Sequence, residues 1–265
     1  MDREDKSMAL DAPPCVLVIA GSDSSGGAGI ARDIETIAAI GGRTCLAVTA
    51  ITVQTHAAVR TVETLDADLV AAQMRAALEA NPVAAIKIGM LASREIIAAV
   101  SAVLGEHRHL PVVLDPVFVS SSGGSLLSVD AIESLKQDLM PLCRLVTPNL
   151  PELALLAGAS HPAAGDDAAI VQARTLLSGK NAILIKGGHA AGPRSTDLLV
   201  AADGTVARFD APRLSASMRG TGCMLASAIA IHLAAGHPLD DSIRHAKAHV
   251  FDKLRAEGTP PAAGG

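Results

Sequence analysis

The run R-G-T-G-C-M at residues 219–224 places two glycines, a threonine and a cysteine directly before an apolar helical pattern. The first N–H groups of a helix have no partners within the helix and carry positive potential. Glycines at 220 and 222 would let an anion approach these donors, which is the geometry of a phosphate site. We expect the pKa of the Cys223 thiol at this positive end to fall below its ordinary value of about 8.5. The alternative is a plain turn followed by a core helix.

A second glycine-rich stretch, G-S-D-S-S-G-G-A-G at residues 21–29, invites comparison with nucleotide-binding loops. It is not a P-loop, because Gly27 follows Gly26 where that motif needs lysine. It is not a dinucleotide-binding fingerprint, because Arg32 stands where the last glycine would be. The stretch is therefore either a tight strand-to-helix turn or a place where a ligand approaches the backbone closely.

The elements that must position these loops alternate between short apolar runs and longer helical patterns. The runs predicted as strands are 15–20, 44–50, 84–89, 112–116, 144–148 and 182–187. The segments with helical spacing are 28–40, 66–80, 93–104, 130–139 and 167–178. Continuous apolar strands alternating with helices predict one doubly wound domain with a mostly parallel sheet. Residues 197–209 instead predict a hairpin that turns at Asp203-Gly204.

Polar motifs follow several of the predicted strands. They are K-I-G-M-L at 87–91, V-L-D-P-V at 113–117, T-P-N-L-P-E at 147–152 and K-G-G-H at 186–189. In open α/β sheets, ligands bind beyond the carboxyl ends of the strands. We therefore expect these motifs and both glycine-rich stretches to line one edge of the sheet.

Composition narrows the classes of partner. The 265 residues contain no Trp, no Tyr and three Phe, so base-stacking platforms for nucleic acid are disfavoured. A net charge of −5 gives no general attraction for polyanions. The charged start carries no signal-peptide pattern, no run is long enough to span a membrane, and the four cysteines form no C-x-x-C pair. We expect a cytoplasmic protein with no membrane or nucleic-acid partner, flexible at residues 1–12 and 258–265 around a single domain at 13–257.

Taken together and in this order, the two glycine-rich stretches and the four polar motifs resemble the hydroxymethylpyrimidine/phosphomethylpyrimidine kinases of thiamine synthesis. The resemblance runs from about Cys15 to about Val250. It implies a ribokinase-like three-layer α/β/α sandwich with a mostly parallel central sheet and an antiparallel edge hairpin. It also implies ATP- and Mg²⁺-dependent phosphorylation of the hydroxymethylpyrimidine and then of its monophosphate, usually by a homodimer.

The resemblance assigns roles to particular residues. Those implied to bind the pyrimidine are Ala28, Asp33, Thr52, Gln54 and Met90. Those implied to serve phosphoryl transfer are the donors Gly220, Thr221 and Gly222, the base Cys223, the Mg²⁺ ligands Asp115 and Glu152, and the nucleotide contacts Asn149 and Lys186. Asp33 is a second candidate for the base. From the residues alone, Asn149 and Glu152 could equally cap a helix, Asp33 could be a charge in a first helical turn, Gln54 a loop amide and Met90 part of the core.

Three features depart from the family or qualify it. Ser24 stands where proline is frequent, which is expected to loosen that loop, and Arg219 stands where histidine is usual. Arg219 would either add positive charge near the phosphates or face solvent. The stretch at 120–125 resembles a flap over the site. A pyridoxal kinase on the same scaffold and a non-catalytic pyrimidine-binding protein stay open as alternatives, whereas the failed fingerprint disfavours a dehydrogenase.

Overall fold

The computed structural model describes residues 12–118, 129–188 and 192–258. The predicted flap at 120–125, His189 of the K-G-G-H motif and most of the two predicted tails lie outside these residues.

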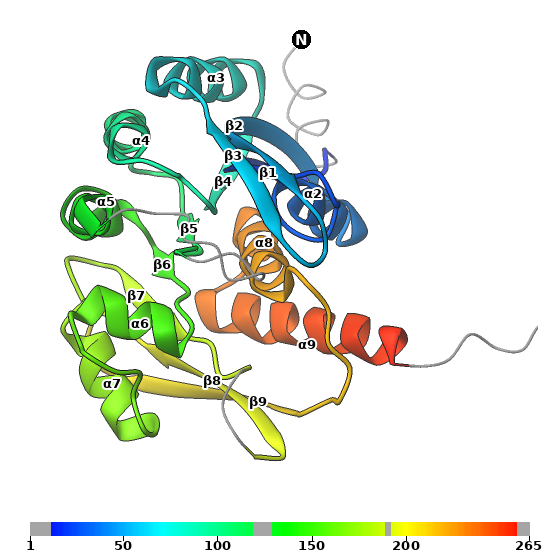
Figure 1. Cartoon of the computed structure of the whole chain (residues 1–265), viewed down its shortest axis with the longest axis vertical. Coiled ribbons are helices and arrows are strands. Elements are labelled where there is room, and N and C mark those ends of the chain that lie inside the picture. The colour runs from blue at the N-terminus through cyan, green and yellow to red at the C-terminus, as the bar shows by residue number, and fades with distance from the viewer. Residues whose placement is uncertain (1–11, 119–128, 189–191, 259–265) are drawn as a thin grey trace, which may run out of the picture.

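The described residues form a nine-stranded sheet in the order β3-β2-β1-β4-β5-β6-β7-β8-β9 (Figure 1). The strands are β1 Cys15–Asp23, β2 Arg43–Gln54, β3 Val59–Thr64, β4 Val83–Ile88, β5 Val112–Leu114, β6 Leu145–Val146, β7 Ala182–Ile185, β8 Arg194–Val200 and β9 Val206–Pro212. The six strands from β2 to β7 in this order pair in parallel, while β3 at one edge and the β8–β9 hairpin at the other pair antiparallel. The predicted sheet and hairpin are confirmed, and β3 is an additional edge strand that the apolar pattern did not predict.

Helices cover both faces of this sheet (Figure 1). The helices are α2 Gly29–Ala39, α3 Ala67–Ala80, α4 Arg94–Glu106, α5 Val129–Ser134, α6 Leu150–Ala157, α7 Asp166–Arg174, α8 Thr221–Ala234 and α9 Leu239–Glu257. The buried side chains of α3, α4, α6 and α7 share one apolar cluster with one face of the sheet, and those of α2, α8 and α9 share a second cluster with the other face. The fold is therefore the predicted three-layer sandwich.

The central strands are buried because their side chains are apolar on both faces. Residues Cys15–Ala20 of β1 are each at most 1% exposed, and β7 is buried throughout. The predicted helix at 130–139 changes type along its length, because α5 passes into a π-helical turn at Leu135–Leu139 and a 3-10 turn that contains Pro141. Within the described part of the chain, no helix combines the length and the apolar character that crossing a membrane would need.

Candidate active site

A cavity of about 730 Å³ opens at the carboxyl ends of the parallel strands. Its wall includes the residues that directly follow β4 to β7, among them Gly89, Asp115, Asn149 and Lys186, and the first turn of α8. Asn149 and Lys186 are paired by an isolated parallel β-bridge, so the sheet itself sets their spacing. The expectation that the polar motifs line one edge is confirmed for the parts of them that the structure describes.

Helix α8 begins at this cavity with no side chain capping its first N–H groups. Gly220 precedes the helix with a φ of 74°, a left-handed conformation that other residues adopt only with strain. A Cβ atom at this position would also lie far inside van der Waals contact of the Gly27 carbonyl oxygen. A Cβ at Gly222 would come within 3.2 Å of Lys186 Nζ. The two glycines therefore let the helix start pack between the first glycine-rich loop and the lysine, with its amides available to an anion.

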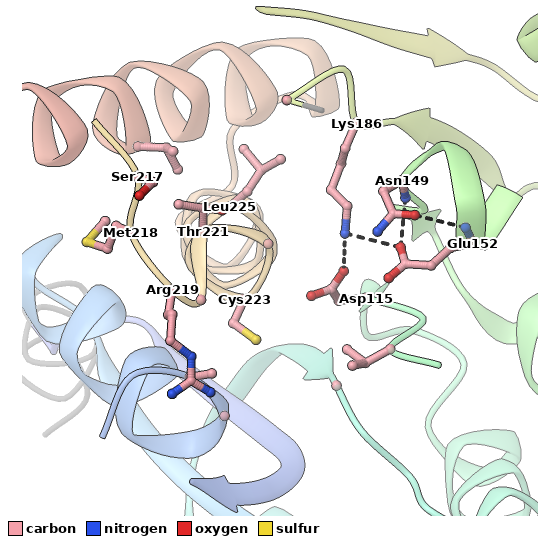
Figure 2. A pocket seen from close by; sticks show the side chains of 18 of the residues that line it. Asp115, Asn149, Glu152, Lys186, Ser217, Met218, Arg219, Thr221, Cys223 and Leu225 are labelled. Atoms are coloured by element: carbon pink, nitrogen blue, oxygen red, sulfur yellow. Dashed lines mark hydrogen bonds and ion pairs between the residues drawn. The ribbon is translucent and has the colours of Figure 1, made fainter. Parts of the chain in front are cut away.

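Lys186 lies between two carboxylates (Figure 2). Its Nζ is 2.6 Å from Asp115 Oδ1 and 3.5 Å from Glu152 Oε2. Burial alone would lower the pKa of Lys186, but these two carboxylates raise it, so the lysine is a fixed cation. Burial raises the pKa of Glu152, against the opposing effect of Lys186. The result is a compact charged cluster on the cavity wall.

Asn149 and Glu152 also cap α6. The Glu152 backbone N–H donates to Asn149 Oδ1 at 2.8 Å, and Glu152 Oε2 accepts from the Asn149 backbone N–H at 2.7 Å. This is a capping box. The two interpretations that the sequence left open are therefore compatible, because the same carboxylate oxygen that caps the helix faces Lys186.

Two carboxylates are too few for an all-protein metal cage. Over the residues that the structure describes, no three side chains of His, Cys, Asp or Glu converge on one point. Asp115 and Glu152 nevertheless suit Mg²⁺, which proteins commonly hold through one or two carboxylates together with substrate phosphates and water.

Cys223 lies in the first turn of α8, half-buried on the cavity wall. Burial raises the pKa of its thiol to about 11, and the nearby carboxylates of Asp33 and Asp115 add to this effect, while Lys87 opposes it. The expectation of a lowered pKa is therefore wrong. The positive helix end was a correct observation, but loss of hydration outweighs it.

Four of the five residues predicted to bind the pyrimidine line the cavity: Ala28, Thr52, Gln54 and Met90. The Thr52 hydroxyl donates to the Ser22 carbonyl at 2.7 Å, which leaves its methyl group and backbone to frame the wall. The carbonyl oxygen of Met90 accepts from Thr49, while its sulfur lies over Gly21. Gln54 supplies an amide at the end of β2.

The fifth residue, Asp33, does not reach the cavity, so its prediction as a substrate contact or alternative base is wrong. Its side chain is fully buried, with one carboxylate oxygen 2.8 Å from Lys87 Nζ and the other accepting from the Ser227 hydroxyl at 2.7 Å. Both carboxylate oxygens therefore already have partners in the protein interior. Asp33 is the fifth residue of α2, and its side chain points toward α8 and β4 rather than into the cavity.

The two departures from the family pattern, Ser24 and Arg219, both contact the segment 54–55 at the end of β2. Ser24 Oγ donates to the Gln54 carbonyl and accepts from the Gln54 N–H, at 2.8 and 2.9 Å, so the loop is tied down rather than loosened. Arg219 neither points at the Lys186 cluster nor faces solvent freely (Figure 2). Its guanidinium donates to Ser25 Oγ at 3.0 Å and the Thr55 carbonyl at 3.2 Å, and lies 3.5 Å from Gln54 Oε1. It joins the start of α8 to the loop beside the predicted pyrimidine end.

The sequence interpretation missed three buried or bound cations around the cavity. Lys87 is held by Asp33, Lys247 of α9 lies 2.6 Å from Asp197 of β8, and Arg213 donates to the Gly187 and Gly188 carbonyls. The sequence did contain a sign that Lys87 is paired. A lysine within the apolar run A-A-I-K-I-G must find a partner if the strand is buried on both faces.

An uncapped helix N-terminus facing a lysine–carboxylate cluster, at the strand ends of a three-layer sandwich, is the arrangement that a phosphotransferase needs. The sequence matches the family profile described as phosphomethylpyrimidine kinase over residues 23–263. The chain belongs to this family, and its fold is ribokinase-like.

Named relatives agree with this assignment. The chain is 44% identical over 243 residues to the hydroxymethylpyrimidine/phosphomethylpyrimidine kinase of Rhizobium meliloti (strain 1021), covering 91% of this chain and 90% of the relative. Its identity to the Escherichia coli (strain K12) enzyme of the same name is 38%, covering 92% and 91%. Among solved structures, the phosphomethylpyrimidine kinase of Clostridium difficile 630 is 35% identical with a TM-score of 0.78, covering 91% and 99%. The pyridoxal kinase of Staphylococcus aureus in complex with pyridoxal is 29% identical with a TM-score of 0.83, covering 95% and 91%.

Proposed function

We propose that this chain transfers the γ-phosphoryl group of ATP to hydroxymethylpyrimidine and then to its monophosphate, as a kinase of thiamine biosynthesis. The observation that carries the proposal is the shared cavity. At the uncapped start of α8, Gly222 packs against Lys186, while Arg219 just before the helix lies 3.5 Å from Gln54, and all of these residues line one cavity. A phosphoryl donor and an alcohol acceptor can therefore meet at the same amides. Solved pyridoxal kinases in complex with ADP and with AMP-PCP support ATP as the co-substrate.

The acceptor hydroxyl oxygen attacks Pγ while the bond from Pγ to the ADP oxygen breaks. The thiolate of Cys223 takes the hydroxyl proton and later releases it to solvent. The N–H groups at residues 220–223 bind the oxygens of the moving phosphoryl group, and Lys186 faces the donor phosphates. Such transition states need little covalent help, so most of the rate comes from positioning and charge stabilisation.

Asp115 and Glu152 would hold Mg²⁺ together with the ATP phosphates, since their oxygen donors suit this ion. When bound, the ion neutralises charge on those phosphates. Asn149 orients Glu152 through the capping box and borders the same cavity. At the other end, the Gln54 amide can both donate to and accept from a pyrimidine edge, with Ala28, Thr52 and Met90 around it.

Pyridoxal is a second candidate acceptor. The specific observation in its favour is the TM-score of 0.83 to a pyridoxal kinase, against 0.78 to a phosphomethylpyrimidine kinase. Higher sequence identity, 35% against 29%, favours the pyrimidine. The homodimer implied by the family resemblance stays a prediction, and light scattering of the purified chain tests it.

The deciding experiment incubates the purified chain with ATP and Mg²⁺ and either hydroxymethylpyrimidine or pyridoxal, with products read by mass. We expect the pyrimidine monophosphate and then the diphosphate. Product from pyridoxal alone would overturn the proposal.

Cys223→Ala should reduce turnover by about 10²–10⁴-fold if the thiolate is the base. Because the pKa of Cys223 is about 11, its thiolate becomes more abundant as pH rises. The turnover of the unmodified chain should therefore increase between about pH 7 and 9, and that of the variant should not. Equal turnover in both proteins across this range would dismiss Cys223 as the base.

A further inference from the structure

Lys87 of β4 is a charged residue at the centre of the sheet, with a side chain that is 0% exposed. Its ammonium lies 2.8 Å from Asp33 Oδ2, and Asp33 Oδ1 accepts from the Ser227 hydroxyl at 2.7 Å. The three residues come from β4, α2 and α8, so they join the sheet to two helices. The proposed phosphoryl-transfer steps use none of them.

The register of α8 places Ser227, the partner of Asp33, one helical turn after Cys223. Ser227 follows Cys223 by four residues, so the two side chains lie on the same face of the helix, one turn apart. Lys87, Gly89 and Cys223 all border the same cavity. A Cβ at Gly89 would come within 2.9 Å of Lys87 Nζ, so the glycine after the strand leaves room for the ammonium.

Stability alone gives a weak reason for such a pair. Removing two charges from water is costly, and apolar side chains of similar volume commonly replace a buried ion pair without loss of stability. Burial alone would lower the pKa of Lys87, but Asp33 raises it, so the cation persists in the interior. A permanent positive charge beside a half-buried thiol requires another explanation.

We propose that Lys87 is a positioning residue for phosphoryl transfer, which acts by stabilising the deprotonated sulfur of Cys223 from beneath the cavity. Asp33 and Ser227 fix the ammonium in place. This inference rests on the proposed function, in which that sulfur takes the proton of the acceptor hydroxyl. It adds no atom to the reaction, since the proton passes from the hydroxyl to sulfur and then to solvent.

Charges from four elements face Cys223. Lys87 from β4 and Lys186 after β7 are positive, while Asp33 from α2 and Asp115 after β5 are negative. Among the charged groups, Lys87 has the largest effect on the thiol and is opposed by the smaller effects of the two carboxylates. The pair of Lys87 and Asp33 therefore has a net acidifying effect on the sulfur.

The test measures the sulfur directly, without relying on catalysis. The full chain and its Lys87→Met variant are treated with iodoacetamide between about pH 8 and 10, and modification of the Cys223 peptide is followed by mass spectrometry. Only the thiolate reacts. A nearby opposite charge commonly shifts a pKa by about 1–3 units, so we expect alkylation at least about tenfold slower in the variant.

Lys247→Met is the matched control, because it breaks another Lys–Asp pair on the cavity wall, at 2.6 Å. It should leave Cys223 alkylation unchanged. An unchanged rate in a folded Lys87→Met protein, or an equal slowing in the control, would overturn the inference. Circular dichroism establishes that each variant is folded.

If Lys87→Met fails to fold because Asp33 is left as a lone buried charge, the double variant Asp33→Asn/Lys87→Met replaces it under the same criterion. It should still react more slowly than the unmodified chain, by less than the single variant would. The alkylation rate is readable even if Cys223→Ala proves fully active. Turnover of Cys223→Ala tests whether Cys223 is the base, and the alkylation rate tests whether Lys87 stabilises its thiolate, so failure of one can be told apart from failure of the other.

Discussion

Gly220→Ala tests the geometry at the start of α8. The φ of 74° is unfavourable for alanine by about 1–2 kcal/mol. The added Cβ would also press on the backbone carbonyl of Gly27, which cannot move aside as a flexible side chain could. Overpacking of this kind costs a further ~1–3 kcal/mol. We therefore expect the free energy of unfolding to fall by about 2–5 kcal/mol.

Gly204→Ala is the matched control. Gly204 has a φ of 83° in the β8–β9 turn, and its added Cβ would meet no atom within 4 Å. Its free energy of unfolding should fall only by the cost of the left-handed backbone conformation, about 1–2 kcal/mol, in a urea titration with an unchanged m-value. It should keep full turnover, because the turn lies outside the cavity wall.

Turnover should separate the two variants further. Displacing the amides that bind the phosphoryl group should cost Gly220→Ala about 10²-fold or more in kcat, the usual effect of losing one such donor. If Gly220→Ala proves as stable and as active as Gly204→Ala, the close packing of this helix start against the first loop is not what holds the site together.

Two further predictions concern the histidines near the carboxyl end of α8 and the arginine just before its start. Burial and the neighbouring His245 lower the pKa of His232 below its ordinary 6.5, and burial also lowers that of His249. Below about pH 6.5 the unfolded chain therefore binds more protons than the folded chain, so the free energy of unfolding should fall as the pH drops. His232→Gln should weaken this pH dependence, which urea titrations at about pH 5.5 and 7.5 would measure. Arg219→Ala removes donors to Ser25 and Thr55, and should raise KM for the pyrimidine about tenfold while KM for ATP stays constant; equal rises in both constants would contradict this.

The fold was predictable where a strand is buried on both faces, because such a strand must be apolar at every position. Runs such as C-V-L-V-I-A are apolar at every position, which suits a parallel strand covered on both faces. Strand β3, V-R-T-V-E-T, carries more polar than apolar side chains because it lies at an exposed edge. It is recognisable as a strand only through its pairing with β2.

The site was predictable where residue type and chain order sufficed, and not where packing decides. Lys186, Asp115 and Glu152 meet because each follows its own parallel strand. The prediction for Asp33 is wrong because helical spacing does not reveal that this face of α2 meets Lys87 of β4. The acidity of Cys223 was misjudged for a similar reason, since a sequence shows the helix end but not how deeply the sulfur is buried.

The pairing of the cavity's lysines explains why the glycines of α8 matter. Each lysine that lines the described part of the cavity, Lys87, Lys186 or Lys247, already lies within 3 Å of a carboxylate oxygen. Each of these lysines therefore already has a carboxylate partner before any substrate arrives. The N–H groups at the start of α8 have no side-chain cap, and their positive potential is directed along the helix axis. The oriented N–H groups therefore favour an anion that lies on the helix axis, in addition to attracting its charge. A side chain at position 220 or 222 would block the approach of this anion.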